Sequence, residues 1–421
     1  STRTDGMVEL DNSRATIENS VFQNADRRRI TAINSSLIVR NSTFADFDVS
    51  GTPENNVLEH IWGRNVIAGG EMIIENNVFG VTPGHNDAID FDAGHRLSGD
   101  PVPQILNNTF NGGGDDALDI EGDFYVQGNV FKHYRKDAYH AAVDSGESNV
   151  ISAGDTHNVG HHYVVTGNVF YDCDHVTLVK ESSFMTFTNN TVVGVDQGAH
   201  ANSIGAINFA LAAGEPEGRG AYLDGNIFVN TPLVFNYLDT GAVATDLTVN
   251  RSILPAGEHY GGAGNIDADA RLTDPAGGDF TLKSGSPAFG SGPVGVDMGA
   301  DVAPGASVSP VPLTETYLTD ATFDVSGDGD YHHAPFLAYK YRLNGGAWSA
   351  EQAPGTQIVL TGLVDGPQSL EVISQNFAGV WQVETEAVTR LWLVDTALSR
   401  VLINEVLATN RTAHMHDARS L

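Results

Sequence analysis

Five acidic side chains lie within nine residues of the stretch "GGGDDALDIEGDFYVQGNVF", which begins at Gly112 and otherwise has the composition of a β-strand. They are Asp115, Asp116, Asp119, Glu121 and Asp123. Carboxylates without thiolates are the hard oxygen ligands that Ca²⁺ prefers in proteins. Two interpretations follow: these side chains hold a calcium ion, or they line a solvated outer face of the strand.

The acidic pattern recurs in two other stretches, so we expect it to form columns. "DAIDFD" (87–92), "DALDIE" (116–121) and "DAYHAA" (137–142) align with one another. Side chains alternate along a strand, so the apolar residues of these stretches point inward and the polar ones outward. The outward positions Asp90, Asp92, Asp119 and Glu121 are metal candidates, and Asp115 and Asp116 of the stretch that begins at Gly112 are candidates as well. The first residues, Asp87, Asp116 and Asp137, also fit turn residues that bind local backbone amides.

Basic residues are scarce, so those near the acidic stretches are the candidates for proton transfer and substrate contact. The chain has 22 Lys and Arg against 53 Asp and Glu. Lys180 and Lys136 are the candidate bases, and Arg135, His140 and Trp62 are the candidate substrate contacts. For Lys180 the sequence favours an outward lysine that pairs with Glu181 or with the acidic columns over a catalytic base.

Two further motifs carry weaker signals. "HNVGHH" places His157 and His161 at a spacing that binds transition metals on a helix, but it falls in a Gly-rich insertion. "DVSGDGD" (324–330) has the composition of a calcium loop without the EF-hand spacing. Neither motif predicts a site as directly as the acidic stretches do.

A repeat supplies the elements that must position these side chains. The pattern Asn or Gly, then Asn or Ser, then a small residue and Phe ends at Phe22, Phe44, Phe79, Phe110, Phe131, Phe170 and Phe228, and "NNTV" at Val192 fits it. The shortest steps are about 22 residues, as expected for stacked coils of short strands. Asn tolerates the left-handed backbone of a sharp corner, and stacked amides hydrogen-bond between coils. The repeat predicts a right-handed parallel β-helix over residues 1–300.

The remainder of the chain has a different organisation. Residues 301–313 are rich in Pro, Ser and Gly and predict a linker. Residues 314–396 contain short alternating strands and the hairpin signal "NGG", which predict a small β-sandwich of the immunoglobulin or fibronectin type. Residues 400–421 are typical of the start of a lamin-tail domain, which leads us to expect that the native protein continues beyond Leu421. The fold class is therefore all-β.

Bulk composition excludes several classes of partner. A formal charge of −31 argues against nucleic acid and anionic membrane surfaces, which bind basic patches. No apolar run approaches the length of a membrane span, and the N-terminus has no signal-peptide pattern, although a signal removed earlier is compatible with the sequence. Cys173 is the sole cysteine, so no intrachain disulfide forms.

Two resemblances bear on function. The "DD..D" strand, Asp115, Asp116 and Asp119, with Asp90 or Asp92 on the preceding coil, resembles the calcium site of β-helical pectate lyases. That resemblance implies a metal that offsets a uronate carboxylate and a lysine base, although no lysine stands in the place expected beside the acidic column. Over its whole length the chain resembles large secreted bacterial proteins that join such a β-helix to sandwich and lamin-tail domains, sometimes with a spore-coat-kinase-like (CotH) domain.

These resemblances imply two functions. The first is a calcium-stabilised module of a secreted or cell-surface bacterial protein that serves attachment, assembly or contact with extracellular polysaccharide. The second is a calcium-dependent polysaccharide lyase. A polygalacturonase-like glycosidase built on Asp115, Asp116 and Asp119 ranks lower, because the supporting motifs of those enzymes are missing.

Overall fold

The computed structural model describes residues 6–47, 57–94, 96–137, 141, 148–154, 160–195, 205–209, 216–236, 246–283, 285–300, 307–310, 312–326, 336–375, 381–382, 384 and 387–398. His140, all of residues 400–421 and most of the range expected to be a linker lie outside these residues.

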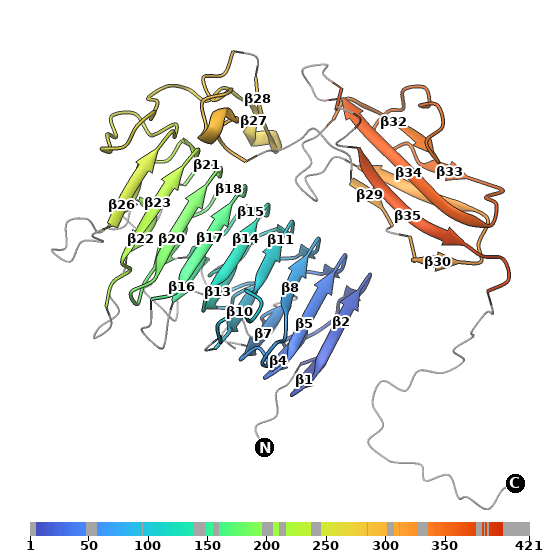
Figure 1. Ribbon diagram of the computed structural model, residues 1–421, viewed down its shortest axis with the longest axis horizontal. Coiled ribbons are helices and arrows are strands. Elements are labelled where there is room, and N and C mark those ends of the chain that lie inside the picture. Colours follow the sequence, from blue (N-terminus) through green and yellow to red (C-terminus); the bar gives the residue numbers. More distant parts are fainter. Residues whose placement is uncertain are drawn as a thin grey trace, which may run out of the picture.

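Three parallel sheets run along the first part of the chain (Figure 1), and each coil contributes one strand to each sheet, except that the coil of β25 and β26 has none in the third. The first sheet contains β1 (Val8–Asp11), β4 (Ile30–Ile33), β7 (Ile61–Arg64), β10 (Ile89–Asp92), β13 (Leu118–Glu121), β16 (Asn149–Gly154), β19 (His175–Val179), β22 (Gly205–Phe209) and β25 (Leu233–Asn236). The second contains β2 (Arg14–Glu18), β5 (Ser36–Arg40), β8 (Met72–Glu75), β11 (Gln104–Leu106), β14 (Phe124–Gln127), β17 (His162–Thr166), β20 (Phe184–Thr188), β23 (Gly220–Asp224) and β26 (Asp246–Asn250). The third contains β3 (Val21–Phe22), β6 (Thr43–Phe44), β9 (Val78–Phe79), β12 (Thr109–Phe110), β15 (Val130–Lys132), β18 (Val169–Tyr171), β21 (Thr191–Val193) and β24 (Ile227–Val229). Sheets of equivalent strands stacked in this way are the arrangement of a parallel β-helix.

The phenylalanine repeat forms a continuous stack inside the coils. Phe79 and Phe110 have ring centroids 4.6 Å apart, and Phe110 and Phe131 have centroids 4.8 Å apart. These distances match the spacing of neighbouring strands in a sheet, about 4.8 Å, so each ring lies on the ring of the next coil. Val192 takes the same place between Phe170 and Phe228, as the sequence pattern predicts.

An asparagine ladder closes the corner before the third sheet. The Asn108 amide donates to the Asn129 side-chain oxygen at 3.0 Å, and Asn129 donates in the same way to Asn168 at 3.0 Å. The residue before each ladder position has a positive φ, for example 53° at Asn107 and 68° at Gly128, which explains the recurrent Asn or Gly there. The predicted amide ladder is confirmed.

The segment after the last coil packs on the outside of the third sheet. It contains β27 (Leu272–Asp274), the 3₁₀ turns η1 (Pro275–Gly277) and η2 (Pro293–Gly295), and β28 (Asp279–Leu282). Phe280 and Met298 of this segment share a buried cluster with Val169 and Ile227. The segment therefore covers apolar side chains that the third sheet would otherwise expose.

A second body follows, with two sheets around their own core. One sheet contains β29 (Ser307–Ser309), β31 (Ala321–Ser326) and β33 (Ile358–Leu360), and the other contains β30 (Glu315–Thr316), β35 (Val388–Val394), β34 (Gly366–Gln375) and β32 (Ala338–Leu343). Phe323 and Trp392 come from different sheets and pack together in the shared core. Strand β29 lies within the range expected to be a linker. It belongs to the second body instead, because its residue Val308 is buried in this core.

Candidate cation site on the first sheet

The acidic columns predicted from the sequence form between β10 and β13. Asp90 pairs in register with Asp119, and Asp92 pairs with Glu121, while the alternate residues of both strands are buried. Side chains in register on adjacent parallel strands lie about 4.8 Å apart. The two strands therefore present four carboxylates as two neighbouring pairs on the outer face of the sheet.

The third stretch assigned to this column, 137–142, does not belong to it. Leu118 pairs with Ile151, and Ile120 pairs with Ala153, so β16 is the next strand of the sheet. All six residues of β16 are buried, which suits the apolar sequence "NVISAG" better than a stretch with charged groups. The acidic columns therefore end after two strands, and Asp119 is followed in register by Ser152.

A tighter carboxylate cluster lies at the corner just before these strands. One oxygen from each of Asp87, Asp115 and Asp116 lies within 4.8 Å of the others. Asp115 and Asp116 are only 9% and 8% exposed. Of the predicted metal candidates, the structure brings Asp115 and Asp116 into this cluster. Asp90, Asp92, Asp119 and Glu121 lie on the strands that follow.

Asp87 was expected to be a turn residue, and the structure shows that its bonding is not local. An Asp87 oxygen accepts a hydrogen bond from the backbone N–H of Asp116 at 3.2 Å, and an Asp116 oxygen accepts one from Asn149 N–H at 2.8 Å. Asp137 likewise accepts from Gly84 N–H at 2.8 Å, 53 residues earlier in the chain. For Asp87 and Asp116 the expectation of local amides is thus wrong, because each of these carboxylates accepts from a neighbouring coil. For Asp137 the structure adds a long-range bond to Gly84. The shared "DA" context of Asp87 and Asp116 was the signal that places them in one column.

Burial and mutual repulsion make these carboxyl groups weak acids. Burial, followed by the charges of Asp115 and Asp119, raises the pKa of Asp87 and of Asp116 well above the usual range. Burial and then the charge of Asp119 raise the pKa of Asp90 to about 7. At the distance of the corner cluster, two ionised carboxylates repel by about 3.5 kcal/mol per pair at an effective dielectric of about 20. The cluster therefore needs protons or a cation.

Lys180 approaches the acidic columns from two strands further along the sheet. Its ammonium nitrogen lies 3.9 Å from an oxygen of Asp119. Burial lowers the pKa of Lys180, but the charges of Asp119 and Asp116, with smaller contributions from neighbouring glutamates, outweigh burial and leave the pKa raised. Lys180 therefore stays protonated at neutral pH, which suits a counter-ion better than a proton acceptor.

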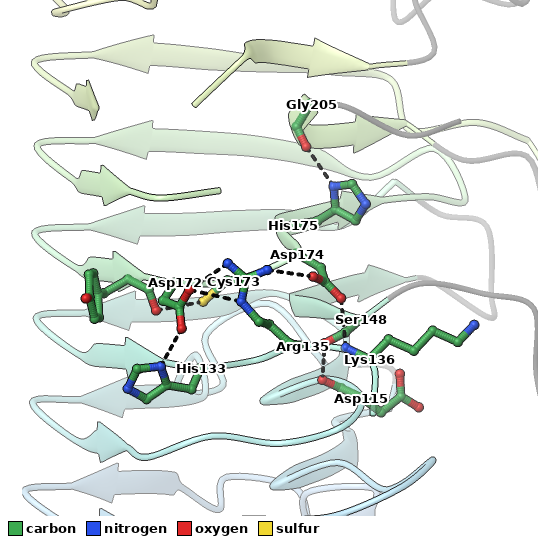
Figure 2. Close-up of polar contacts among 11 residues, drawn as sticks. Asp115, His133, Arg135, Lys136, Ser148, Asp172, Cys173, Asp174, His175 and Gly205 are labelled. Atoms are coloured by element: carbon green, nitrogen blue, oxygen red, sulfur yellow. Dashed lines mark hydrogen bonds and ion pairs between the residues drawn. The ribbon is translucent and has the colours of Figure 1, made fainter. Parts of the chain in front are cut away.

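The second candidate base, Lys136, lies at another corner beside an ion-pair network (Figure 2). Arg135 donates to Asp172 at 2.6 Å and to Asp174 at 3.4 Å, and the Lys136 backbone N–H donates to Asp174 at 2.7 Å. His133 also contacts Asp172, at 2.6 Å. Figure 2 shows the Lys136 side chain extending away from this network. Arg135, a candidate substrate contact, thus joins two coils of the fold.

Trp62, the other described substrate candidate, contacts cations of its own chain. The guanidinium carbons of Arg28 and Arg64 lie 4.2 Å and 4.9 Å from the centre of its ring. Trp62 pairs in register with Asp90 on the neighbouring strand and lowers the pKa of that carboxyl group slightly. Trp62 therefore lies next to the acidic columns, with its ring between two arginines of its own chain.

The weaker motifs form no comparable cluster among the described residues. The His161 ring nitrogen lies 3.3 Å from Asp123, and His162 contacts the Thr186 hydroxyl at 2.8 Å, while His157 lies outside the described part. Asp324 accepts a hydrogen bond from Gln357 at 2.7 Å, and residues 327–330 are likewise outside it.

Comparison with known proteins gives the chain no family. No protein-family model matches it, and no curated protein is detectably similar. Over the described residues, no helix is long and apolar enough to cross a membrane.

Proposed function

We propose that this chain belongs to a secreted or cell-surface bacterial protein in which a right-handed parallel β-helix binds calcium. The bound ion stabilises the coils around β10 and β13, and the module serves attachment, assembly or contact with extracellular polysaccharide. In this proposal the second body is immunoglobulin-like, and residues 400–421 begin a lamin-tail domain. The observation that carries the proposal is the Asp87–Asp115–Asp116 cluster.

The cluster supports this proposal because it offers oxygen ligands at a spacing compatible with calcium. Calcium takes oxygen ligands at about 2.3–2.6 Å, so ligands on opposite sides of one ion lie up to about 5 Å apart. Oxygens of Asp87, Asp115 and Asp116 all lie within 4.8 Å of one another, and no nitrogen or sulfur ligand is needed. A divalent ion would also relieve the repulsion that raises the pKa values of these groups.

Calcium titration of the purified chain tests this function. We expect calcium to raise the unfolding temperature and chelator to lower it, with about 2.7 kcal/mol of stabilisation when calcium exceeds its dissociation constant about 100-fold. Asp116→Asn keeps an oxygen that can accept from Asn149 but loses the charge, so calcium stabilisation should fall sharply. Asp26→Asn, a change at an exposed carboxylate of the same β-helix, is the matched control. If neither calcium nor chelator changes the unfolding temperature, the proposal is contradicted.

A calcium-dependent polysaccharide lyase is the second candidate, and the Lys180–Asp119 contact is the observation that favours it. In such a reaction a base removes the C5 proton of a uronate, the C4–O bond breaks, and a C4–C5 double bond forms. The high pKa of Lys180 fits binding of the uronate carboxylate better than removal of its proton. An increase in ultraviolet absorbance from the unsaturated product, dependent on calcium and lost in Lys180→Ala, would establish the lyase.

A further inference from the structure

Lys180 is fixed at the edge of the acidic columns by its own backbone. Its N–H donates to the carbonyl of Ala153 at 3.1 Å, which continues the pairing of β19 with β16. Its carbonyl accepts from Ser183 N–H at 3.1 Å, and it forms an antiparallel bridge with Glu217. The starting point of the Lys180 side chain is therefore set by three neighbouring segments.

A glycine on the preceding coil leaves room for the Lys180 side chain to reach the acidic columns. A Cβ atom at Gly154 would lie 2.8 Å from Cε of Lys180, 3.0 Å from a carboxylate oxygen of Glu181 and 3.5 Å from Cγ of Glu121. Gly154 has no left-handed φ, so its backbone conformation does not require glycine. What favours glycine is space, because a side chain at position 154 would force the end of the Lys180 side chain to shift.

The ammonium group ends beside an oxygen that otherwise has no partner. Asp119 Oδ1 is a buried atom without a hydrogen-bond partner among the described residues. Lys180 Nζ lies 3.9 Å away, too far for a hydrogen bond but close enough for a strong charge interaction. The Lys180 side chain is 22% exposed, so water screens this interaction only partly.

We propose that Lys180 is a tethered counter-ion that competes with calcium for the negative charge of the first sheet. This inference rests on the proposed function, since it describes how the same site is regulated. Lys180 adds a fixed positive charge beside these carboxylates, and a calcium ion at Asp87, Asp115 and Asp116 meets a negative field that this charge has already reduced. Lys180 is thus a residue that sets calcium affinity without being a ligand.

Calorimetric titration with calcium chloride alone tests the inference on the full chain. Lys180→Met keeps the apolar stem and removes the charge, so we expect calcium to bind about tenfold more tightly than to the natural chain at low ionic strength. The gain should shrink as salt is added, because screening weakens the field of the lysine. Lys180→Arg should bind calcium as the natural chain does, and Lys283→Met, a change at an exposed lysine far along the sequence, is the control.

A second variant guards against a folding defect in Lys180→Met. Gly154→Ala leaves the charge in place but forces the stem away from its path, so we expect calcium affinity to rise by a smaller factor. If the natural chain binds calcium and neither variant binds it more tightly, the proposal that Lys180 competes with calcium is wrong, whereas the proposed calcium site is supported. If no chain binds calcium, both proposals are wrong. Binding by Lys180→Met but not by the natural chain would support the competition directly.

Discussion

Replacing Asp90 by asparagine should flatten the dependence of stability on pH in the absence of divalent ions. The pKa of Asp90 is about 7 in the folded chain, raised mainly by burial and then by Asp119, against 3.8 for an ordinary aspartate. Between these values the folded chain holds a proton that the unfolded chain has released. The stabilisation is therefore complete at low pH and is lost as pH rises through 7.

The size of the effect follows from the two pKa values. Between pH 5 and pH 8, the loss attributable to Asp90 is about 2.5 kcal/mol, since each unit of pKa difference is worth about 1.4 kcal/mol. Asparagine is neutral throughout this range and has nearly the same size and shape as aspartate. Asp87 and Asp116 have raised pKa values as well, so the natural chain should lose more than this amount in total.

Urea unfolding followed by circular dichroism at pH 5, 6, 7 and 8, with chelator present, measures the effect. The natural chain should become less stable as pH rises, and Asp90→Asn should lose about 2.5 kcal/mol less over the range. Asp26→Asn should retain the full dependence. The reasoning fails if Asp90→Asn keeps the slope of the natural chain, or if the natural chain becomes more stable from pH 5 to pH 8.

Two further predictions concern the ladders that hold the coils together, and both are read from the free energy of unfolding in urea. Asn129→Ala should cost about 3–5 kcal/mol, because it removes bonds to Asn108 and Asn168 and leaves buried polar groups unpaired. Gln127→Ala, at an exposed position of the same coil, should change stability by less than about 0.5 kcal/mol, and equal losses would contradict the ladder. Phe110→Ala should cost about 3–5 kcal/mol through the cavity left between two stacked rings, and a loss below about 1 kcal/mol would show that the stack collapses into the gap.

The sequence was sufficient for the parts of the fold that repeat. The Phe and Asn positions recur with the coil, so they identify both the inner stack and the corner ladder before any coordinates are known. Asp90 and Asp119 were paired correctly because the stretches around them match residue by residue. Stretches of similar sequence occupy equivalent positions in successive coils as long as no long insertion lies between them.

The insertion after Phe131 is where this guide failed. The "DA" of Asp137 and Ala138 suggested a third acidic strand, yet the strand that follows β13 in the sheet begins at Asn149. The strand beside β13 must place apolar side chains in the interior of the coil, and the segment "NVISAG" does this better than "DAYHAA". The contact of Lys180 with Asp119 was one of the alternatives that the sequence left open. Its geometry depends on Gly154, whose importance appears only when the coils are stacked.

The negative charge of the first sheet is compensated by different groups at different positions. Burial and repulsion raise the pKa of Asp90 to about 7, so this carboxyl group keeps a proton until the pH rises through that value. At Asp119, the ammonium of Lys180 supplies a charge at 3.9 Å. At the corner, His85 lies 3.2 Å from Asp115, but three carboxylates converge there within 4.8 Å. A single divalent ion at that corner would contact three carboxylates, against two at each pair of the columns, which is why we propose calcium at the corner rather than between the paired strands.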